Sequence, residues 1–180
     1  LRRYNGKALV NSVSGKRESM EAVFPLVKKY GGTVIALTLD EEGIPATAEG
    51  RVDIARRILD TAAQYGIDKK DIVFDTLTMT VSADPNAANV TLEALRRIRE
   101  ELGCHTSLGV SNVSFGLPMR ETVNASFFTQ AMRKGLSAGI VNPLSVAMMD
   151  AYVTYLALDG QDDNCEAYIQ RMADRAATAV

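Results

Sequence analysis

The chain has 180 residues, of which 47% are hydrophobic and 23% are charged, and its net charge at pH 7 is −2. This balance is that of a folded globular protein, and the length fits one hydrophobic core. The charge lacks the positive excess of proteins that bind nucleic acids or anionic membranes, so we expect neither kind of partner.

Few residues in the sequence could hold a metal ion. Its two cysteines, Cys104 and Cys165, lie far apart, and His105 is its one histidine. We therefore expect no disulfide framework and no bound metal, and a reducing, cytoplasmic location fits best. Any chemistry has to come from amides, carboxylates and backbone groups.

Short β-rich runs alternate with amphipathic stretches along the whole chain. We predict strands at residues 7–10, 33–39, 71–74, 106–110 and 139–141. Between them apolar residues recur at helical spacing, and Gly31-Gly32 ends the first helix. Asp84-Pro85 is predicted to open the third helix and Pro118 the fourth.

Five strands separated by helices predict parallel pairing through right-handed crossovers. Two α/β architectures fit, an open doubly wound sheet and part of a (β/α)₈ barrel. An open nucleotide-binding sheet usually carries a glycine-rich phosphate loop after its first strand. Here residues 11–16 read Asn-Ser-Val-Ser-Gly-Lys, which matches neither common loop motif, so the pattern favours the barrel.

Each predicted strand is followed by an amide or a carboxylate. The five residues are Asn11, Asp40, Asp75, Asn112 and Asn142. Ligands of parallel sheets and barrels bind outside the carboxyl ends of the strands, so these side chains should converge on one mouth. Any one of them could instead form a turn or a helix cap. Amides and carboxylates suit the planar edge of a pterin or a purine, which the pattern does not separate.

The stretch Gly109 to Pro118 reads G-V-S-N-V-S-F-G-L-P and is followed by Arg120, Asn124 and Phe127. It resembles the motif after strand seven of the methyltetrahydrofolate-binding methyltransferases. These are the folate module of cobalamin-dependent methionine synthase and the methyltetrahydrofolate:corrinoid methyltransferases. Residues 10–14, 71–75 and 139–143 are similar to the ends of strands four, six and eight of this family.

The resemblance implies a TIM (β/α)₈ barrel of the dihydropteroate synthase-like type, with roughly its C-terminal five βα units in this chain. The three earlier strands are expected before Leu1 or on another chain. Residues 1–158 would be the barrel part, with a helix at about 145–158. Residues 159–180, with a helix at about 164–177, would begin a linker to a cobalamin-binding module.

The resemblance also implies a function and a set of site residues. The chain would bind 5-methyltetrahydrofolate and transfer its N5-methyl group to Co(I) of a cobalamin held by a partner domain or corrinoid protein. The residues implied as pterin-binding are Asn11, Asp75, Asn112, Asn142 and Arg120. Asn112 and Asp75 would also be the catalytic residues.

Three alternatives remain. Dihydropteroate synthases share the fold but carry a Ser-Arg-Lys type motif after strand seven, where this chain has Ser111-Asn112-Val113. A truncated barrel could be a non-catalytic pterin-binding or docking module. A purine-binding open sheet is the third. Two unpaired strand edges would also favour association, including a homodimer.

Overall fold

Five parallel strands form one sheet in the computed structural model of the chain, which describes residues 1–178. The strands are β1 (Leu9–Ser14), β2 (Thr33–Leu37), β3 (Ile72–Asp75), β4 (His105–Gly109) and β5 (Ala138–Ile140). Their order in the sheet is the order in the sequence, and every neighbouring pair is parallel.

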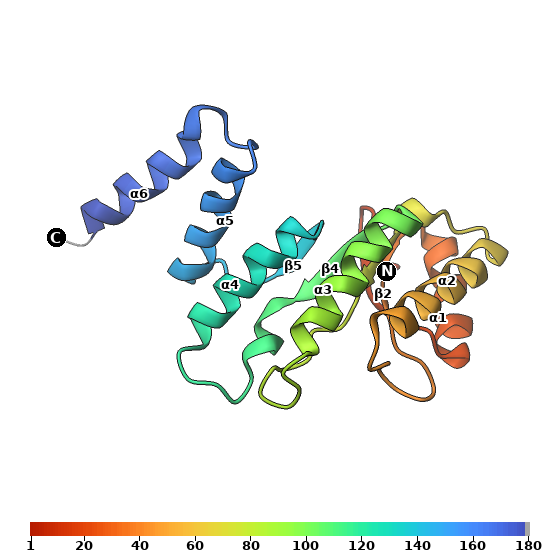
Figure 1. Cartoon of the computed structure of the whole chain (residues 1–180). Helices are drawn as coiled ribbons and strands as arrows, with labels where there is room; N and C mark the ends of the chain where they lie inside the picture. Colours follow the sequence, from red (N-terminus) through yellow and green to blue (C-terminus); the bar gives the residue numbers. More distant parts are fainter. Residues whose placement is uncertain (179–180) are drawn as a thin grey trace.

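Helices connect and follow these strands. The α-helices are α1 (Arg17–Tyr30), α2 (Ala48–Gln64), α3 (Ala87–Arg97), α4 (Arg120–Arg133), α5 (Val146–Leu158) and α6 (Glu166–Thr178). Shorter helical segments are η1 (Lys69–Asp71), η2 (Ile98–Leu102, a π-helix), η3 (Val110–Ser114) and η4 (Asp163–Cys165). Consecutive helices from α1 to α5 contact one another, and Figure 1 shows α2, α3 and α4 side by side along the sheet.

The strand order decides between the two predicted architectures. In a doubly wound sheet the order reverses at a switch point, and helices cover both faces. Here the order runs from β1 to β5 without reversal, so right-handed crossovers place all the connecting helices on one face. The chain therefore folds as five consecutive βα units of a barrel, as predicted. We call the face turned away from the helices the inner face.

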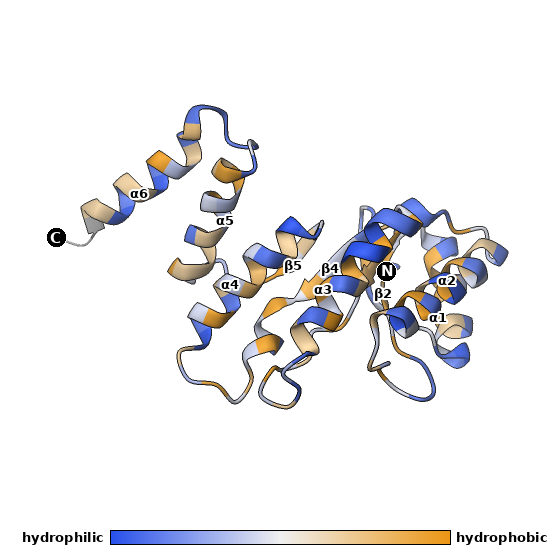
Figure 2. Cartoon of the chain, in the orientation of Figure 1, coloured by the Kyte–Doolittle hydropathy of each residue, from blue (hydrophilic) through white to orange (hydrophobic). Residues whose placement is uncertain are grey.

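Local sequence explains the regular elements. In α1, Met20, Phe24 and Val27 recur at helical spacing and are buried against the sheet. Gly31 ends this helix with a left-handed φ of 65°, and its N–H bonds to Val27 O. The Thr47 hydroxyl caps α2 by accepting from the Gly50 N–H at 3.1 Å. In Figure 2, α1, α2 and α3 carry hydrophobic residues on one side and hydrophilic residues on the other.

Several predicted boundaries were wrong. The first strand begins and ends later than predicted, so Asn11 lies inside β1 and not after it. α3 begins at Ala87 because Asp84 caps the turn before the helix, accepting from the Asn86 N–H at 2.8 Å. α4 begins two residues after Pro118 because Met119 has a left-handed φ of 49°. These are loop conformations, which tertiary contacts decide more than local propensity does.

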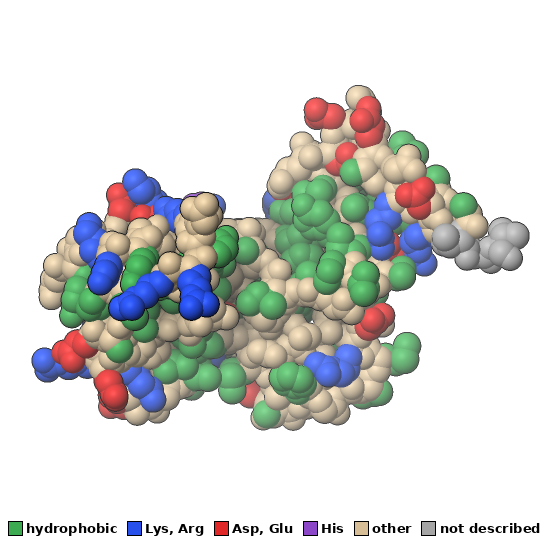
Figure 3. Space-filling view, turned by 180° about the vertical axis from the view of Figure 1, so that it is seen from behind, with side chains coloured by type: hydrophobic (Ala, Val, Ile, Leu, Met, Phe, Trp, Pro, Cys, Tyr) green, Lys and Arg blue, Asp and Glu red, His purple; other side chains and the backbone are tan. Residues whose placement is uncertain are grey.

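The sheet has two open edges, β1 and β5, and all three residues of β5 are exposed. Apolar side chains are exposed beside both edges: Leu9 by 58%, Ile140 by 54% and Leu144 by 88%. Figure 3 shows more hydrophobic side chains gathered on α5, where this helix stands above the sheet layer. No helix within residues 1–178 is both long and apolar enough to cross a membrane.

Candidate pterin-binding site

The carboxyl ends of β3 and β4 bring together two of the predicted site residues. Phe74 and Leu108 pack against the helices, so their neighbours Asp75 and Ser107 face the inner side of the sheet. Asp75 and Ser107 are paired across the two strands. The motif that holds Asn112 begins immediately after this point, at the end of β4.

Asp75 is the last residue of β3 and is half-buried. Its Oδ1 accepts a hydrogen bond from the Leu77 N–H at 2.8 Å, which leaves acceptor positions on the carboxylate for a ligand. Burial raises the pKa of the Asp75 carboxyl, and the Leu77 N–H and the charge of Arg51 oppose that rise.

Asn112 lies in η3, three residues beyond the end of β4. Its side chain folds back over the strand end, because its Nδ2 lies 3.4 Å from the point where a Cβ on Gly109 would stand. Gly109 alternates with Leu108, so that point is on the inner face. The Asn112 amide is thus placed at the same mouth as Asp75.

Arg120 supports the loop that carries Asn112. Its Nε donates to Ser114 Oγ at 3.0 Å and its Nη2 donates to the Ser111 carbonyl at 2.8 Å. The guanidinium carbon lies 4.6 Å from the centre of the Phe115 ring, a cation–π contact. These contacts fix the backbone on both sides of Asn112, in addition to the pterin contact implied for Arg120.

Asn142 follows β5 and borders a separate cavity of about 540 Å³. The cavity is lined by Val110, Ser111, Arg120, Glu121, Asn124, Ile140, Val141, Asn142, Ser145 and Met148. The Asn142 Oδ1 accepts from the Leu144 N–H at 3.0 Å, so part of its side chain stabilises the turn before α5. Arg120 and Asn142 therefore share one cavity beside the Asp75 and Asn112 mouth.

The remaining strand-end residues are less close. Asn11 is exposed on the inner face of β1, and β2 separates it from Asp75 on β3. A register shift between Asn11 and Val13 marks a bulge at this point of β1. Asp40 bonds to Arg57 at 2.8 Å, and Arg57 belongs to α2. Asp40 is thus engaged by a helix on the opposite side from the inner face.

Three further residues have buried polar atoms without a partner. Within the described part of the chain these atoms are Thr78 Oγ1, Ser107 Oγ and Asn124 Oδ1. Buried hydroxyls and amides are normally bonded, so such atoms at a site are candidates for ligand contact. The Asn124 signal was present in the sequence, within the motif of the resemblance. The sequence did not mark Ser107 or Thr78 as a site residue, because Ser and Thr are ordinary in strands and loops.

Comparison with known proteins identifies the family. The sequence model described as pterin binding enzyme matches residues 1–142. The chain belongs to the pterin-binding enzyme family. That membership agrees with the five parallel βα units, and it fits the amides and carboxylate at the inner carboxyl edge.

Individual relatives of this family member include a methylcorrinoid:tetrahydrofolate methyltransferase from Eubacterium limosum. It is 33% identical over 165 residues, which are 89% of this chain and 60% of that protein. The methionine synthase of Mycobacterium tuberculosis is 32% identical over 163 residues, 83% of this chain and 14% of the synthase. That of Mycobacterium leprae is 32% identical over 155 residues, 79% of this chain and 13% of the synthase. The chain thus spans 60% or less of these relatives.

Proposed function

We propose that this chain is the pterin-binding part of a methyltransferase that moves a methyl group between N5 of a tetrahydrofolate and a corrinoid held by a partner. The observation that carries the proposal is that the Asp75 carboxylate and the Asn112 amide lie at the ends of adjacent strands, on the inner face of a barrel segment. The names of the relatives, a corrinoid–folate methyltransferase and two methionine synthases, support it.

Asp75 would recognise the pterin ring. The 2-amino-pyrimidinone edge of a pterin presents two N–H groups in one plane, and a carboxylate accepts such a pair. The half-buried position of Asp75 strengthens these bonds, because the local dielectric is lower than that of water. Asn11 on the inner face of β1, and Arg120 and Asn142 around the neighbouring cavity, would contact other parts of the pterin.

Asn112 would act on the proton at N5. A methyl group leaves a tertiary amine only when that nitrogen gains positive charge, so the site must stabilise a proton on N5 in the transition state. The Asn112 amide oxygen can accept a hydrogen bond from that N–H, and the loop held by Arg120 keeps the amide in place. A corrinoid held by a partner would supply the cobalt nucleophile.

The direction of transfer does not change these roles. The Eubacterium limosum relative is named for transfer from a methylcorrinoid to tetrahydrofolate, the reverse of the transfer implied by the resemblance. Both directions pass through one transition state, so an amide that stabilises the proton on N5 serves both. The conditions in which the protein works decide the direction.

We also propose a role for the C-terminal residues. α6 extends away from the sheet in Figure 1, and residues 159–180 would lead from the barrel part, residues 1–158, towards the corrinoid-binding module. We expect the protein to act in the cytoplasm, which fits its two widely spaced cysteines.

The pterin site is tested by calorimetric titration of the 180-residue chain with 5-methyltetrahydrofolate. Asp75→Asn removes the ionised acceptor and should weaken binding about tenfold or more. Asp40→Asn is the matched control, because Asp40 ends the neighbouring strand region but bonds to Arg57. Equal affinities in the native chain and in Asp75→Asn would remove Asp75 from the site.

The role of Asn112 is tested by kinetics. With Co(I) cobalamin supplied, Asn112→Ala should slow methyl transfer by about 100-fold and weaken folate binding by less than about threefold. Asn89→Ala, on the exposed surface of α3, should change neither. Equal losses of rate and affinity would contradict a transition-state role. Folate binding without any transfer in the native chain would instead indicate a non-catalytic pterin-binding module.

A further inference from the structure

Arg51 is a buried cation directly behind the site. It belongs to α2 and is only 3% exposed. Its position follows the buried stripe of that helix, in which Ala55, Ile58 and Ala62 recur at helical spacing. An arginine in such a stripe is costly to desolvate, so its hydrogen-bond partners show what it is there to hold.

The guanidinium bonds to oxygen atoms from three segments. Its Nε donates to the Pro45 carbonyl at 3.0 Å, in the loop between β2 and α2. Its Nη1 lies 2.7 Å from the Thr76 carbonyl, 2.9 Å from the Leu77 carbonyl and 3.1 Å from Thr91 Oγ1. Arg51 therefore joins two loops at the carboxyl edge of the sheet and the first half of α3.

Leu77 connects Arg51 to Asp75. Leu77 has a left-handed φ of 62°, which a side chain with a Cβ adopts only when its surroundings impose it. In this conformation its N–H donates to the Asp75 carboxylate, while its carbonyl accepts from Arg51 and from the Thr91 hydroxyl. The contacts of Arg51 thus hold the turn whose amide orients the carboxylate.

We propose that Arg51 is a positioning residue for pterin binding, which holds the 75–77 turn so that the Asp75 carboxylate is presented at the mouth of the barrel. The inference rests on the proposed function, because it requires that Asp75 binds the pterin. Arg51 itself lies on the helix side of β3 and acts through the turn.

The charge of Arg51 adds an electrostatic effect to the geometry. Burial raises the pKa of Asp75, and the positive charge of Arg51 lowers it again. Burial lowers the pKa of Arg51, and the negative charges of Asp75 and Asp84 oppose that change. From β4 the group paired with Asp75 is Ser107, which does not titrate. Arg51 is therefore the charged side chain that lowers the pKa of Asp75 and so keeps its carboxylate ionised to lower pH.

The test compares Arg51→Gln and Arg51→Lys in the 180-residue chain. The titration of the Asp75 carboxyl carbon is followed by ¹³C NMR, with Asp75→Asn for assignment. Binding of 5-methyltetrahydrofolate is measured by calorimetry across the same pH range. Arg56→Gln is the control, because Arg56 lies on the outer side of α2 in exposed ion pairs.

We expect Arg51→Gln to raise the pH at which Asp75 titrates and to raise the pH below which pterin affinity is lost. At pH 7 its affinity should fall by about tenfold or more. Arg51→Lys keeps the charge but loses the fork of donors, so it should retain a near-native titration of Asp75 with weakened binding. Arg56→Gln should behave as the native chain.

If Asp75 titrates in Arg51→Gln as it does in the native chain, the proposal is overturned. This holds even when pterin affinity falls equally at all pH values, because a pH-independent loss is what a purely structural residue would cause. If Arg51→Gln does not fold, native affinity in Arg51→Lys overturns it instead. Full pterin affinity in Asp75→Asn would contradict the proposed function instead. The two failures can be told apart, because the NMR titration of Asp75 is measured without pterin.

Discussion

Asp75 illustrates how a proposed site residue can lower stability. Its pKa in the folded chain is raised by burial, so the folded state binds a proton more readily than the unfolded state. Between the unfolded value, about 3.9, and the folded value, stability therefore falls as pH rises. At neutral pH the ionised carboxylate is a net cost to folding, which the proposed role in pterin binding would explain.

This cost gives a prediction for Asp75→Asn, measured by urea unfolding from pH 4 to pH 7. The amide oxygen can accept the Leu77 N–H in place of the carboxylate, and no buried carboxylate charge remains at this position. The variant should therefore be more stable than the native chain at pH 7, and the gain should shrink as pH falls towards about 4. Lower stability at pH 7 would mean that the attraction of Arg51 outweighs burial. Asp40→Asn, which loses an ion pair, should show no gain.

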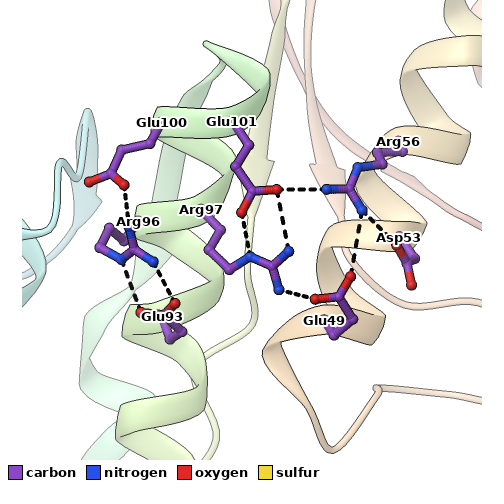
Figure 4. A network of polar contacts seen from close by, with 8 residues as sticks. All are labelled: Glu49, Asp53, Arg56, Glu93, Arg96, Arg97, Glu100 and Glu101. Carbon is purple, nitrogen blue, oxygen red and sulfur yellow. Dashed lines mark hydrogen bonds and ion pairs between the residues drawn. The ribbon is translucent and has the colours of Figure 1, made fainter.

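Between elements, a network of ion pairs joins α2 to the end of α3 and η2 (Figure 4). Arg56 of α2 contacts Asp53 at 2.8 Å and Glu101 at 2.6 Å. Arg97 contacts Glu101 at 2.5 Å and also Glu49, which lies in the first turn of α2. Hydrogen bonds to Glu101 and Glu49 raise the pKa of Arg97, so it stays charged throughout the accessible pH range.

Arg97→Met should lower the urea midpoint at low ionic strength more than Arg96→Met does. Both arginines bind glutamates, but the partners of Arg96 are Glu93 of α3 and Glu100 of η2, which directly continues α3. Arg97 alone of the two links different helices, so its loss should loosen the packing of α2 on α3. The difference should largely disappear in about 1 M NaCl, where exposed charges are screened. Equal urea midpoints of the two variants at low salt would show that the ion pairs between the helices do not stabilise the fold.

Over the whole molecule, α6 forms an arm outside the layer of sheet and helices, attached through α5, which packs on α4 (Figure 1). Asp150 of α5 holds α6 through Arg171 at 2.8 Å and through Arg175. Apolar contact adds less, since Ile169 of α6 is 60% exposed. Such an element is expected to open without unfolding the sheet.

Asp150→Asn should therefore speed amide hydrogen exchange in α6 by about threefold to tenfold, with exchange in β2 and β3 unchanged. Asp163→Asn, in the exposed turn between the two helices, is the control and should leave α6 unchanged. Faster exchange in the strands as well would show that the arm and the sheet open together. That outcome would argue against residues 159–180 as a separable linker.

Local sequence was enough to predict the succession of strands and helices and the position of Asp75 at a strand end. These features depend on local spacing of apolar residues, which neighbouring residues report directly. The resemblance likewise placed Asn112 after the fourth strand, where the structure has it. A motif of consecutive residues can be recognised without knowing how the rest of the chain folds.

The strand order, which distinguishes a barrel segment from an open sheet, could be read only from the folded chain. It also placed Asn11 inside β1 and left the Ser107 hydroxyl buried without a partner. The buried bonds of Arg51 to Thr76, Leu77 and Pro45, on which its proposed role rests, likewise join segments that are far apart in the sequence. Pairing, burial and the bonds of a buried charge depend on residues far apart in the sequence, so no local pattern contains them.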